Sequence, residues 1–209
     1  MALRYTFHRW RQVRETFRIS ILILLLSGAS AAQSLYFPPG SLDDPSHVVP
    51  SPSETYSKYL EALDEPSLWS LSKTQKEQSY RFLWLRSFHR PIAVRVDVNS
   101  DGTSRLTFKM ATGAGGYTAG ELVRSDTTRL TKEKTTWFLE KIEENKFWEL
   151  QTVDRSRMGL DGAAWVIEGA KNGSYHIVDR WSPDHGSVRI IGLLMLHKLV
   201  KLKIPGPIY

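Results

Sequence analysis

The sequence predicts an α+β fold in which a single antiparallel β-sheet with a central hairpin packs against two or three helices. Three observations support this prediction: a hairpin signal late in the chain, a strand with regular apolar and polar alternation, and two well-separated helical stretches. The chain has 209 residues, 41% of them hydrophobic, which suffices for one ordinary domain with its own core. Long apolar runs are few, and a parallel doubly wound sheet is therefore disfavoured.

The hairpin signal lies within Gly159–Pro183, where two runs rich in β-formers flank Asn172-Gly173. Asn and Gly tolerate positive φ, which both central positions of a type I′ turn require. A two-residue loop sets Lys171 opposite Ser174, and the register then sorts the other side chains by parity. One face is expected to carry Tyr175, Glu168, Ile177, Val166, Asp179 and Trp181, and the other His176, Ile167, Val178, Trp165 and Arg180.

Because side chains alternate between the two faces of a strand, the polar residues of this hairpin are divided between its faces. His176 and Asp179 are predicted on opposite faces, which disfavours a catalytic pair built from this strand alone. Glu168 is a diagonal neighbour of Asp179 on one face, an arrangement that can serve acid-base chemistry or metal binding. Such acids more often pair with arginines. The arginines expected nearby are Arg81, Arg95 and Arg105.

Residues 1–32 have the three parts of a secretory signal peptide: a basic region, the apolar run Ile19–Leu26, and the small residues Ala29-Ser30-Ala31. The apolar run is much shorter than the roughly 20 residues of a transmembrane helix, so cleavage and a periplasmic or secreted location are expected. The alternative is an uncleaved anchor in the inner membrane. The segment holds five of the 28 basic and one of the 22 acidic residues, so its removal lowers the net charge from +6 to +2. Nucleic-acid binding then loses its electrostatic support.

Residues 33–53 are rich in Pro, Ser and Asp and lack apolar periodicity, which is typical of an extended or disordered linker. The globular domain is expected over residues 54–209. It begins with an amphipathic helix that ends before Pro66, and a second short helix is expected within Ser67–Gln78. Both are predicted to lie at the surface. The first helix is indicated by apolar residues at spacings of three and four: Tyr56, Tyr59, Leu60 and Leu63.

Strands are expected over Tyr80–Val98, with a break at His89-Arg90-Pro91. Part of this region also fits a helical face, but its aromatic and β-branched residues favour strands. Arg105–Ala111 alternates between apolar and polar residues and is the clearest half-buried strand. The loop Gly113–Gly120 lacks the Gly-Lys-Ser/Thr ending of a P-loop and is interpreted as a connection, followed by a returning strand at Glu121–Arg124.

Thr131–Asn145 is the main predicted helix, with Thr131 as its N-cap and an apolar stripe that includes Phe138. Ser187–Leu202 is too short and too charged to span a bilayer. It is expected as a buried helix, in which Gly192 permits a close approach to the sheet; attachment to a membrane surface is the weaker alternative. These two helices are predicted to cover one face of the sheet.

No signature of a known enzyme class is present. The chain contains no cysteine, which excludes disulfides, thiolate metal ligands and a cysteine nucleophile. No serine lies in a Gly-x-Ser-x-Gly motif, and no two histidines have metal-ligand spacing, so neither a metal nor a cofactor is expected. Arg180 beside Trp165 is interpreted as a cation–π or packing contact. The weak catalytic candidates are Glu168, His176 and Asp179.

Four segments together carry a resemblance: Tyr80-Arg-Phe-Leu-Trp-Leu-Arg-Ser-Phe-His-Arg-Pro91, Gly115-Gly-Tyr117, Asp161-Gly-x-x-Trp165-x-x-Glu168-Gly and Tyr175-His-x-x-x-Arg180-Trp-Ser-Pro183. They resemble a group of small uncharacterised exported bacterial proteins. The resemblance covers roughly Tyr80–Gly192. Because that group has no assigned activity, the resemblance implies export and a single domain and transfers no catalytic residue.

Two functional hypotheses follow. The favoured one is a non-catalytic binding or accessory domain of the cell envelope that engages an unknown protein or envelope component. The alternative is a small hydrolase that uses Glu168 or Asp179 with His176 or an arginine. The position of four residues distinguishes the two hypotheses: Glu168, His176, Asp179 and Arg95. If they converge on one water-accessible pocket, the hydrolase is favoured; if they are dispersed or locked in buried ion pairs, the binding domain is favoured. The residues expected to bind are Tyr117, Tyr175, Arg180, Trp181 and Arg95.

Overall fold

The computed structural model describes residues 35–42, 50–75, 77–157, 159–204, 206 and 208–209. All of them fall within one compact unit, Gln33–Tyr209. The predicted signal segment lies outside the described residues, so its cleavage stays a prediction. No helix in the described part of the chain is long and apolar enough to cross a membrane.

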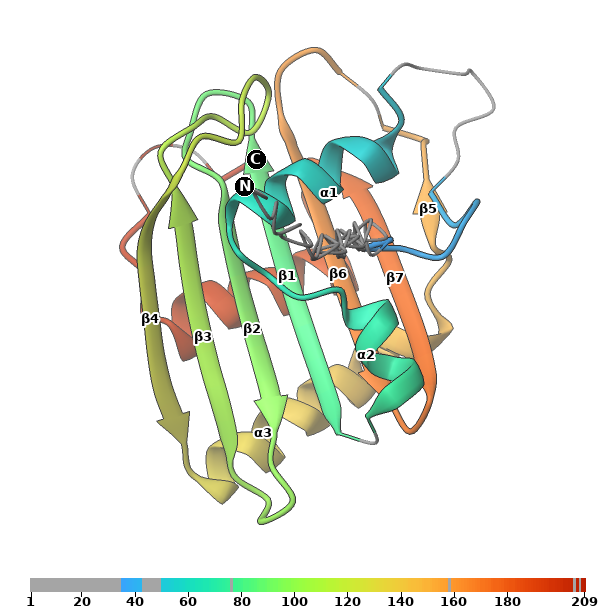
Figure 1. Ribbon diagram of the computed structural model, residues 1–209, viewed down its shortest axis with the longest axis vertical. Coiled ribbons are helices and arrows are strands. Elements are labelled where there is room, and N and C mark those ends of the chain that lie inside the picture. The colour runs from blue at the N-terminus through green and yellow to red at the C-terminus, as the bar shows by residue number, and fades with distance from the viewer. Residues whose placement is uncertain (1–34, 43–49, 76, 158, 205, 207) are drawn as a thin grey trace, which may run out of the picture. The chain divides into compact units, whose positions relative to one another are not determined.

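Within the described residues, seven strands form one sheet in the order β4-β3-β2-β1-β6-β7-β5 (Figure 1). Neighbouring strands are antiparallel except β5, which runs parallel to β7. The α+β class is confirmed, but the sheet is mixed and larger than expected, and β1 is its middle strand. The strands are β1 Gln78–Arg86, β2 Ile92–Val98, β3 Ser104–Ala111, β4 Leu122–Leu130, β5 Val153–Asp154, β6 Ala163–Lys171 and β7 Ser174–Trp181.

Helices lie on both faces of the sheet, where the sequence predicted one covered face. Figure 1 shows α1 and α2 in front of the sheet and α3 behind it. The prediction was wrong because α1 is no surface helix: Tyr56, Tyr59 and Leu60 bury its apolar face. The four α-helices described are α1 Pro52–Ala62, α2 Leu68–Thr74, α3 Lys132–Glu144 and α4 Ser187–Leu193, the last continuing as a π-helix over Leu194–Leu199.

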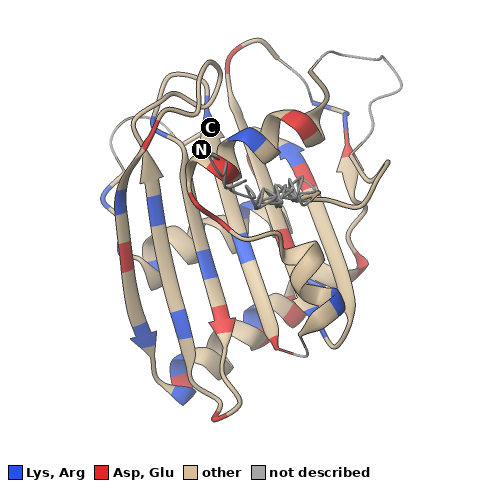
Figure 2. Cartoon of the chain, viewed as in Figure 1, with Lys and Arg blue, Asp and Glu red and all other residues tan. Residues whose placement is uncertain are grey.

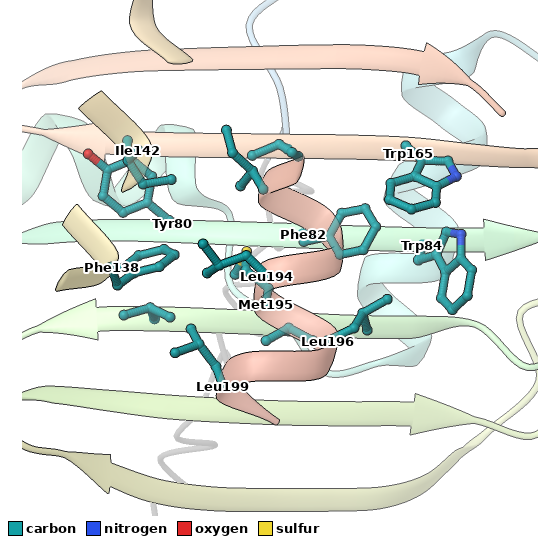
Figure 3. Packing of buried hydrophobic residues seen from close by; sticks show 14 of the residues in the cluster. Tyr80, Phe82, Trp84, Phe138, Ile142, Trp165, Leu194, Met195, Leu196 and Leu199 are labelled. Carbon is teal, nitrogen blue, oxygen red and sulfur yellow. The ribbon is translucent and has the colours of Figure 1, made fainter. Parts of the chain in front are cut away.

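Two hydrophobic cores flank the sheet in the described part of the chain, because its strands bury side chains on both sides. The larger core lies under α3 and α4; Figure 3 shows Phe82, Trp84 and Trp165 packed within it. The smaller core lies under α1 and includes Phe37 and Leu42. These two residues come from the predicted linker, so this part of it packs against the domain and is not a free spacer.

The hairpin forms with the predicted register. Lys171 lies opposite Ser174, and Glu168 lies opposite Ile177. Asn172 and Gly173 have φ values of 52° and 82°, as the type I′ turn requires. Counting from the turn therefore assigned every side chain of β6 and β7 to its correct face.

Three further predictions can be compared with the structure. Thr131 caps α3 by accepting a hydrogen bond from the Lys134 amide, as expected. A Cβ at Gly192 would lie 2.5 Å from the Trp165 ring, so the predicted close approach is present. Strand β4 continues to Leu130, beyond the expected end at Arg124. It lies at the edge of the sheet with Leu122–Arg129 exposed, and an edge strand needs no apolar alternation to pair with its neighbour.

Candidate functional site

A pocket of about 340 Å³ lies where β1 and β7 end. Five parts of the chain contribute to it: the start of α1, the end of β1, the glycine loop, the connection after β5, and the hairpin strands. This volume lies within the range of roughly 300–1,000 Å³ that is usual for small-molecule sites. Its apolar lining includes Pro50, Pro52, Leu85, Leu160, Ala164 and Trp181.

Asp179 is the acidic group of this pocket, and only 1% of it is exposed. Its Oδ2 accepts hydrogen bonds from the Tyr56 hydroxyl at 3.1 Å and from Arg155 Nη1 at 2.9 Å. Burial raises the pKa of Asp179 above its ordinary value, although the charge of Arg155 opposes the shift. Burial and the adjacent carboxylate hold the pKa of Tyr56 well above its usual range. Tyr56 therefore remains a proton donor at neutral pH.

Two arginines line the pocket, and each is paired with an acid. Arg155 Nη1 donates to Asp179, and the Arg155 side chain is 25% exposed. Its Nη2 has almost no accessible surface and no hydrogen-bond partner among the described residues, so a ligand cannot reach that atom in this conformation. Arg157 pairs with Asp184 at 2.5 Å.

Exposed apolar residues lie beside the pocket. Leu160 lines it and is 97% exposed. Phe88 and Tyr117 are both exposed with their ring centroids 5.9 Å apart, and each directly follows a lining residue, Ser87 or Gly116. An apolar ligand would therefore find contacts at the pocket and around it.

Gly115 and Gly116 of the glycine loop line the pocket, and their amides are both engaged. Gly115 N–H donates to the carbonyls of Arg86 and His89, and Gly116 N–H donates to the carbonyl of Ser87. A Cβ at Gly115 would lie 2.5 Å from the Leu85 backbone, so glycine is required there for packing. These contacts agree with the interpretation of the loop as a connection and leave no nest of amides for a phosphate.

Glu168 lies in a different environment on the same face of the sheet. Its Oε2 lies 2.7 Å from Arg81 Nε and 2.5 Å from Arg81 Nη2, and its Oε1 accepts a hydrogen bond from the Tyr175 hydroxyl. Neither the Glu168 nor the Arg81 side chain has exposed surface. Burial raises the pKa of Glu168, with the charge of Arg81 opposing the shift. Arg81 was among the partners predicted for this acid.

The Glu168 network continues into the segment that joins α1 to α2. Glu65 accepts from Arg95 Nε at 2.9 Å and from Arg81 Nη1 at 3.4 Å. Arg81 Nη1 also donates to the Pro66 carbonyl at 2.6 Å. Figure 2 shows charged residues of both signs on β2 and β4 and only basic ones on β3; on β2, Arg95 is paired with Asp97 as well. This network fastens the two helices to the sheet.

The four candidate residues do not converge. Asp179 lines the pocket, Glu168 and Arg95 belong to the buried network, and His176 lies on the opposite face, as parity predicted. The His176 ring packs 5.1 Å from that of Phe147, and burial lowers its pKa. A joint acid-base site of these residues is therefore absent.

The predicted binding residues are also divided. Tyr117 is exposed and Trp181 lines the pocket, whereas Tyr175 is partly buried and directs its hydroxyl to Glu168. Arg180 lies opposite Trp165 as predicted, and its guanidinium donates to the carbonyls of Gln151 and Thr152. The guanidinium above that ring is Arg189, at 5.7 Å.

Sequence reasoning missed two residues of the pocket. Tyr56 was assigned only to the apolar face of its helix, and Arg155 lies in a polar connection without a pattern. Tyr56 and Arg155 lie 123 and 24 positions from Asp179. No local spacing relates such distant residues, and only the fold brings them together.

Comparison with known proteins adds no functional information. The sequence matches no protein-family model, no curated protein and no solved structure. Among the described residues, no group of three or more His, Asp or Glu side chains is placed to hold a metal ion. The interpretation of the site therefore depends on its own geometry.

Proposed function

We propose that the protein is an exported, non-catalytic binding or accessory domain of the cell envelope, and that its ligand site is the pocket around Tyr56, Arg155 and Asp179. The observation that supports this best is the pocket of about 340 Å³, in which the hydrogen-bonded group of Tyr56, Arg155 and Asp179 lies beside several apolar lining residues. A few directed polar groups on an apolar surface are typical of small-molecule sites.

The hydrolase alternative is less well supported. General acid-base catalysis needs titratable groups that face one space within hydrogen-bond reach of a substrate. Glu168 is enclosed in its ion pair with Arg81, and His176 faces the other core. Asp179 remains as a single acid, already engaged by Tyr56 and Arg155. This arrangement positions Arg155. Tyr56 is the second titratable group of the pocket, but its hydroxyl already donates to Asp179 and its pKa lies well above its usual range.

The proposed export depends on the first 32 residues, whose basic, apolar and small-residue parts favour signal-peptide cleavage. Mass spectrometry of the periplasmic or secreted fraction should find an N-terminus at Ala32 or Gln33. A membrane-bound product that retains Met1–Leu26 would contradict release and favour the anchored alternative.

The pocket itself can be tested with 1-anilinonaphthalene-8-sulfonate, an anionic aromatic dye that fluoresces in apolar sites. We expect saturable binding of one dye molecule per chain. Leu160→Glu places a negative charge at the pocket and should weaken binding at least tenfold. Because Leu160 is 97% exposed, this change should leave the fold intact.

Val123→Glu provides the matched control, because Val123 is an exposed apolar residue on β4 that does not line the pocket. Its dye affinity should equal that of the wild type. Equal weakening by both substitutions, or no saturable binding at all, would contradict the proposed site. Near-ultraviolet circular dichroism of each variant verifies that its tertiary packing is retained.

A further inference from the structure

We propose that β4 pairs with β4 of a second copy of this chain, antiparallel and centred on Thr127, so that two sheets join edge to edge in a dimer. This interaction surface goes beyond the proposed function and does not depend on it, because β4 does not line the ligand pocket. Three observations support the proposal: an open strand edge, a self-complementary order of side chains, and apolar residues at one end of β4 that match a hollow at the other.

The two edges of the sheet differ. In the described part of the chain, the sheet ends at β5, which has two residues, and at β4, which has nine. Figure 1 shows β4 at the left of the sheet, beyond the strands that α1 and α2 cover. Leu122–Arg129 is exposed, and β4 contains neither proline nor lysine, which commonly protect a sheet edge. Because an edge strand has backbone donors and acceptors on its free side, β4 can accept a further strand.

The pairing of β4 with β3 limits the registers that a second copy can adopt. That pairing is regular from Arg124 to Leu130 and shifts between Arg124 and Leu122. Opposite side chains share a face of a sheet, so a two-fold axis must coincide with a residue and cannot fall between two. An axis at Thr127, the middle of the regular part, sets the whole of that part opposite its counterpart.

The side chains of β4 complement each other in this register. Thr127 would lie opposite Thr127 of the second copy, and Asp126 opposite Thr128. These pairs can hydrogen-bond, and no two like charges lie directly opposite each other. An axis at Asp126 would set two aspartates opposite each other, which is destabilising. An axis at Ser125 would pair Arg124 with Asp126 but would include the irregular start of the strand.

The two ends of β4 also match each other. Leu122 and Val123 are exposed apolar residues at its start. A hollow of about 400 Å³ lies at its end and is lined by Thr103, Arg129, Leu130, Thr131, Lys132 and Glu133. An antiparallel partner brings the start of one strand next to the end of the other, so each copy would place its apolar pair beside the hollow of the other. This reciprocity favours a second copy over an unrelated strand, and apolar burial adds to the stability of the pair.

Sedimentation velocity of the purified protein over a range of concentrations tests the proposal. We expect a reversible equilibrium between one chain and two, with no larger assembly, because two-fold pairing uses both β4 edges and closes the assembly. A monomer at all concentrations up to the millimolar range would overturn the proposal. A mass that keeps growing beyond two chains would overturn it as well.

Thr127→Lys and Thr127→Glu test the position of the axis. Each sets two like charges directly opposite each other and should weaken the dimer at least fivefold. An equimolar mixture of the two variants should restore the dimer, because a lysine then lies opposite a glutamate. A mixture that stays monomeric would overturn the axis at Thr127. Because Thr127 is exposed, both variants should fold, which near-ultraviolet circular dichroism verifies.

Thr128→Lys is the matched control, the same substitution at the next exposed residue of the strand. It sets a lysine opposite Asp126 of the second copy, so the dimer should keep its affinity or become tighter. Equal weakening by Thr127→Lys and Thr128→Lys would overturn the register, and a dimer unaffected by Thr127→Lys would place the interface elsewhere. Dye binding at the ligand pocket should be the same in all these variants, because β4 does not line it.

Discussion

The two buried acids of the β6–β7 hairpin lie on one face of the sheet in contrasting surroundings. Glu168 and its partner Arg81 have no exposed side-chain surface. Asp179 is almost as buried, but the side chain of its partner Arg155 is 25% exposed and lines a pocket. Burial of an acid therefore does not identify a functional site by itself. The informative difference is whether its partner can reach a ligand.

The contrast extends to what each acid holds in place. Glu168 fixes Arg81, which also contacts Glu65 and the Pro66 carbonyl between α1 and α2. That network joins the front helices to the sheet and has a structural role. Asp179 fixes Arg155 and Tyr56 at the pocket. The same chemical group thus joins helices to the sheet in one position and fixes pocket-lining side chains in the other.

The largest expected effect is that of Glu168→Ala on stability. It removes the acceptor of two Arg81 donors and leaves the buried guanidinium with Glu65 and the Pro66 carbonyl as its other acceptors. Removing one partner of a buried ion pair costs about 3–5 kcal/mol. Urea unfolding followed by tryptophan fluorescence measures this free energy. The double variant Arg81→Met, Glu168→Leu should recover part of the lost stability. A cost below about 1 kcal/mol for Glu168→Ala would contradict the structural role assigned to Glu168.

A smaller loss is expected for Asp179→Ala. The free energy of unfolding should fall by about 1–3 kcal/mol, the usual cost of leaving buried donors without an acceptor. The loss stays below that of Glu168→Ala because Arg155 is partly exposed and can reorient toward water. Tyr56→Phe removes one donor to the same oxygen and should cost about 1 kcal/mol. If Asp179→Ala were as costly as Glu168→Ala in the same urea experiment, the two acids would not differ as proposed.

The hairpin could be predicted because its determinants are local. Asn172-Gly173 specifies the turn type, the turn specifies the register, and the register assigns the faces. On this basis His176 and Asp179 were correctly separated before any tertiary contact was known. The partner of Glu168 was narrowed to three arginines, of which Arg81 is the one that binds it.

The pocket could not be predicted because its polar groups come from separate elements. Tyr56 carries both an apolar ring and a hydroxyl, so its position on a helical stripe explained it without a second role. Once the sheet was expected to be covered on one face only, α1 was assigned to the surface. Phe37 and Leu42 are buried beside α1 because the second face of the sheet is also covered. No local sequence pattern indicates that second covered face, so their burial could not be predicted.

The smallest effect expected is a pH dependence that distinguishes Asp179 from an exposed acid. Burial raises the pKa of Asp179 above its ordinary value of 3.8, so the folded protein retains a proton that the unfolded chain has released. The stability contributed by this group is complete below 3.8 and is lost as the pH rises through the folded pKa. Asparagine imitates the protonated acid, so the wild type and Asp179→Asn should be similarly stable at low pH. As the pH rises, the wild type should become progressively less stable than Asp179→Asn.

Asp184→Asn provides a control of opposite sign. Hydrogen bonds from Arg157 and His185 lower the pKa of Asp184 to about 2, so its contribution is present above 3.8 and is lost as the pH falls toward 2. The wild type should therefore become more stable than Asp184→Asn as the pH rises over that interval. Urea titrations of the three proteins at matched ionic strength from about pH 2 to pH 8 measure both trends. If the wild type also gained stability over Asp179→Asn with rising pH, the charge of Arg155 would outweigh burial, and Asp179 would behave as an ordinary ion-paired acid.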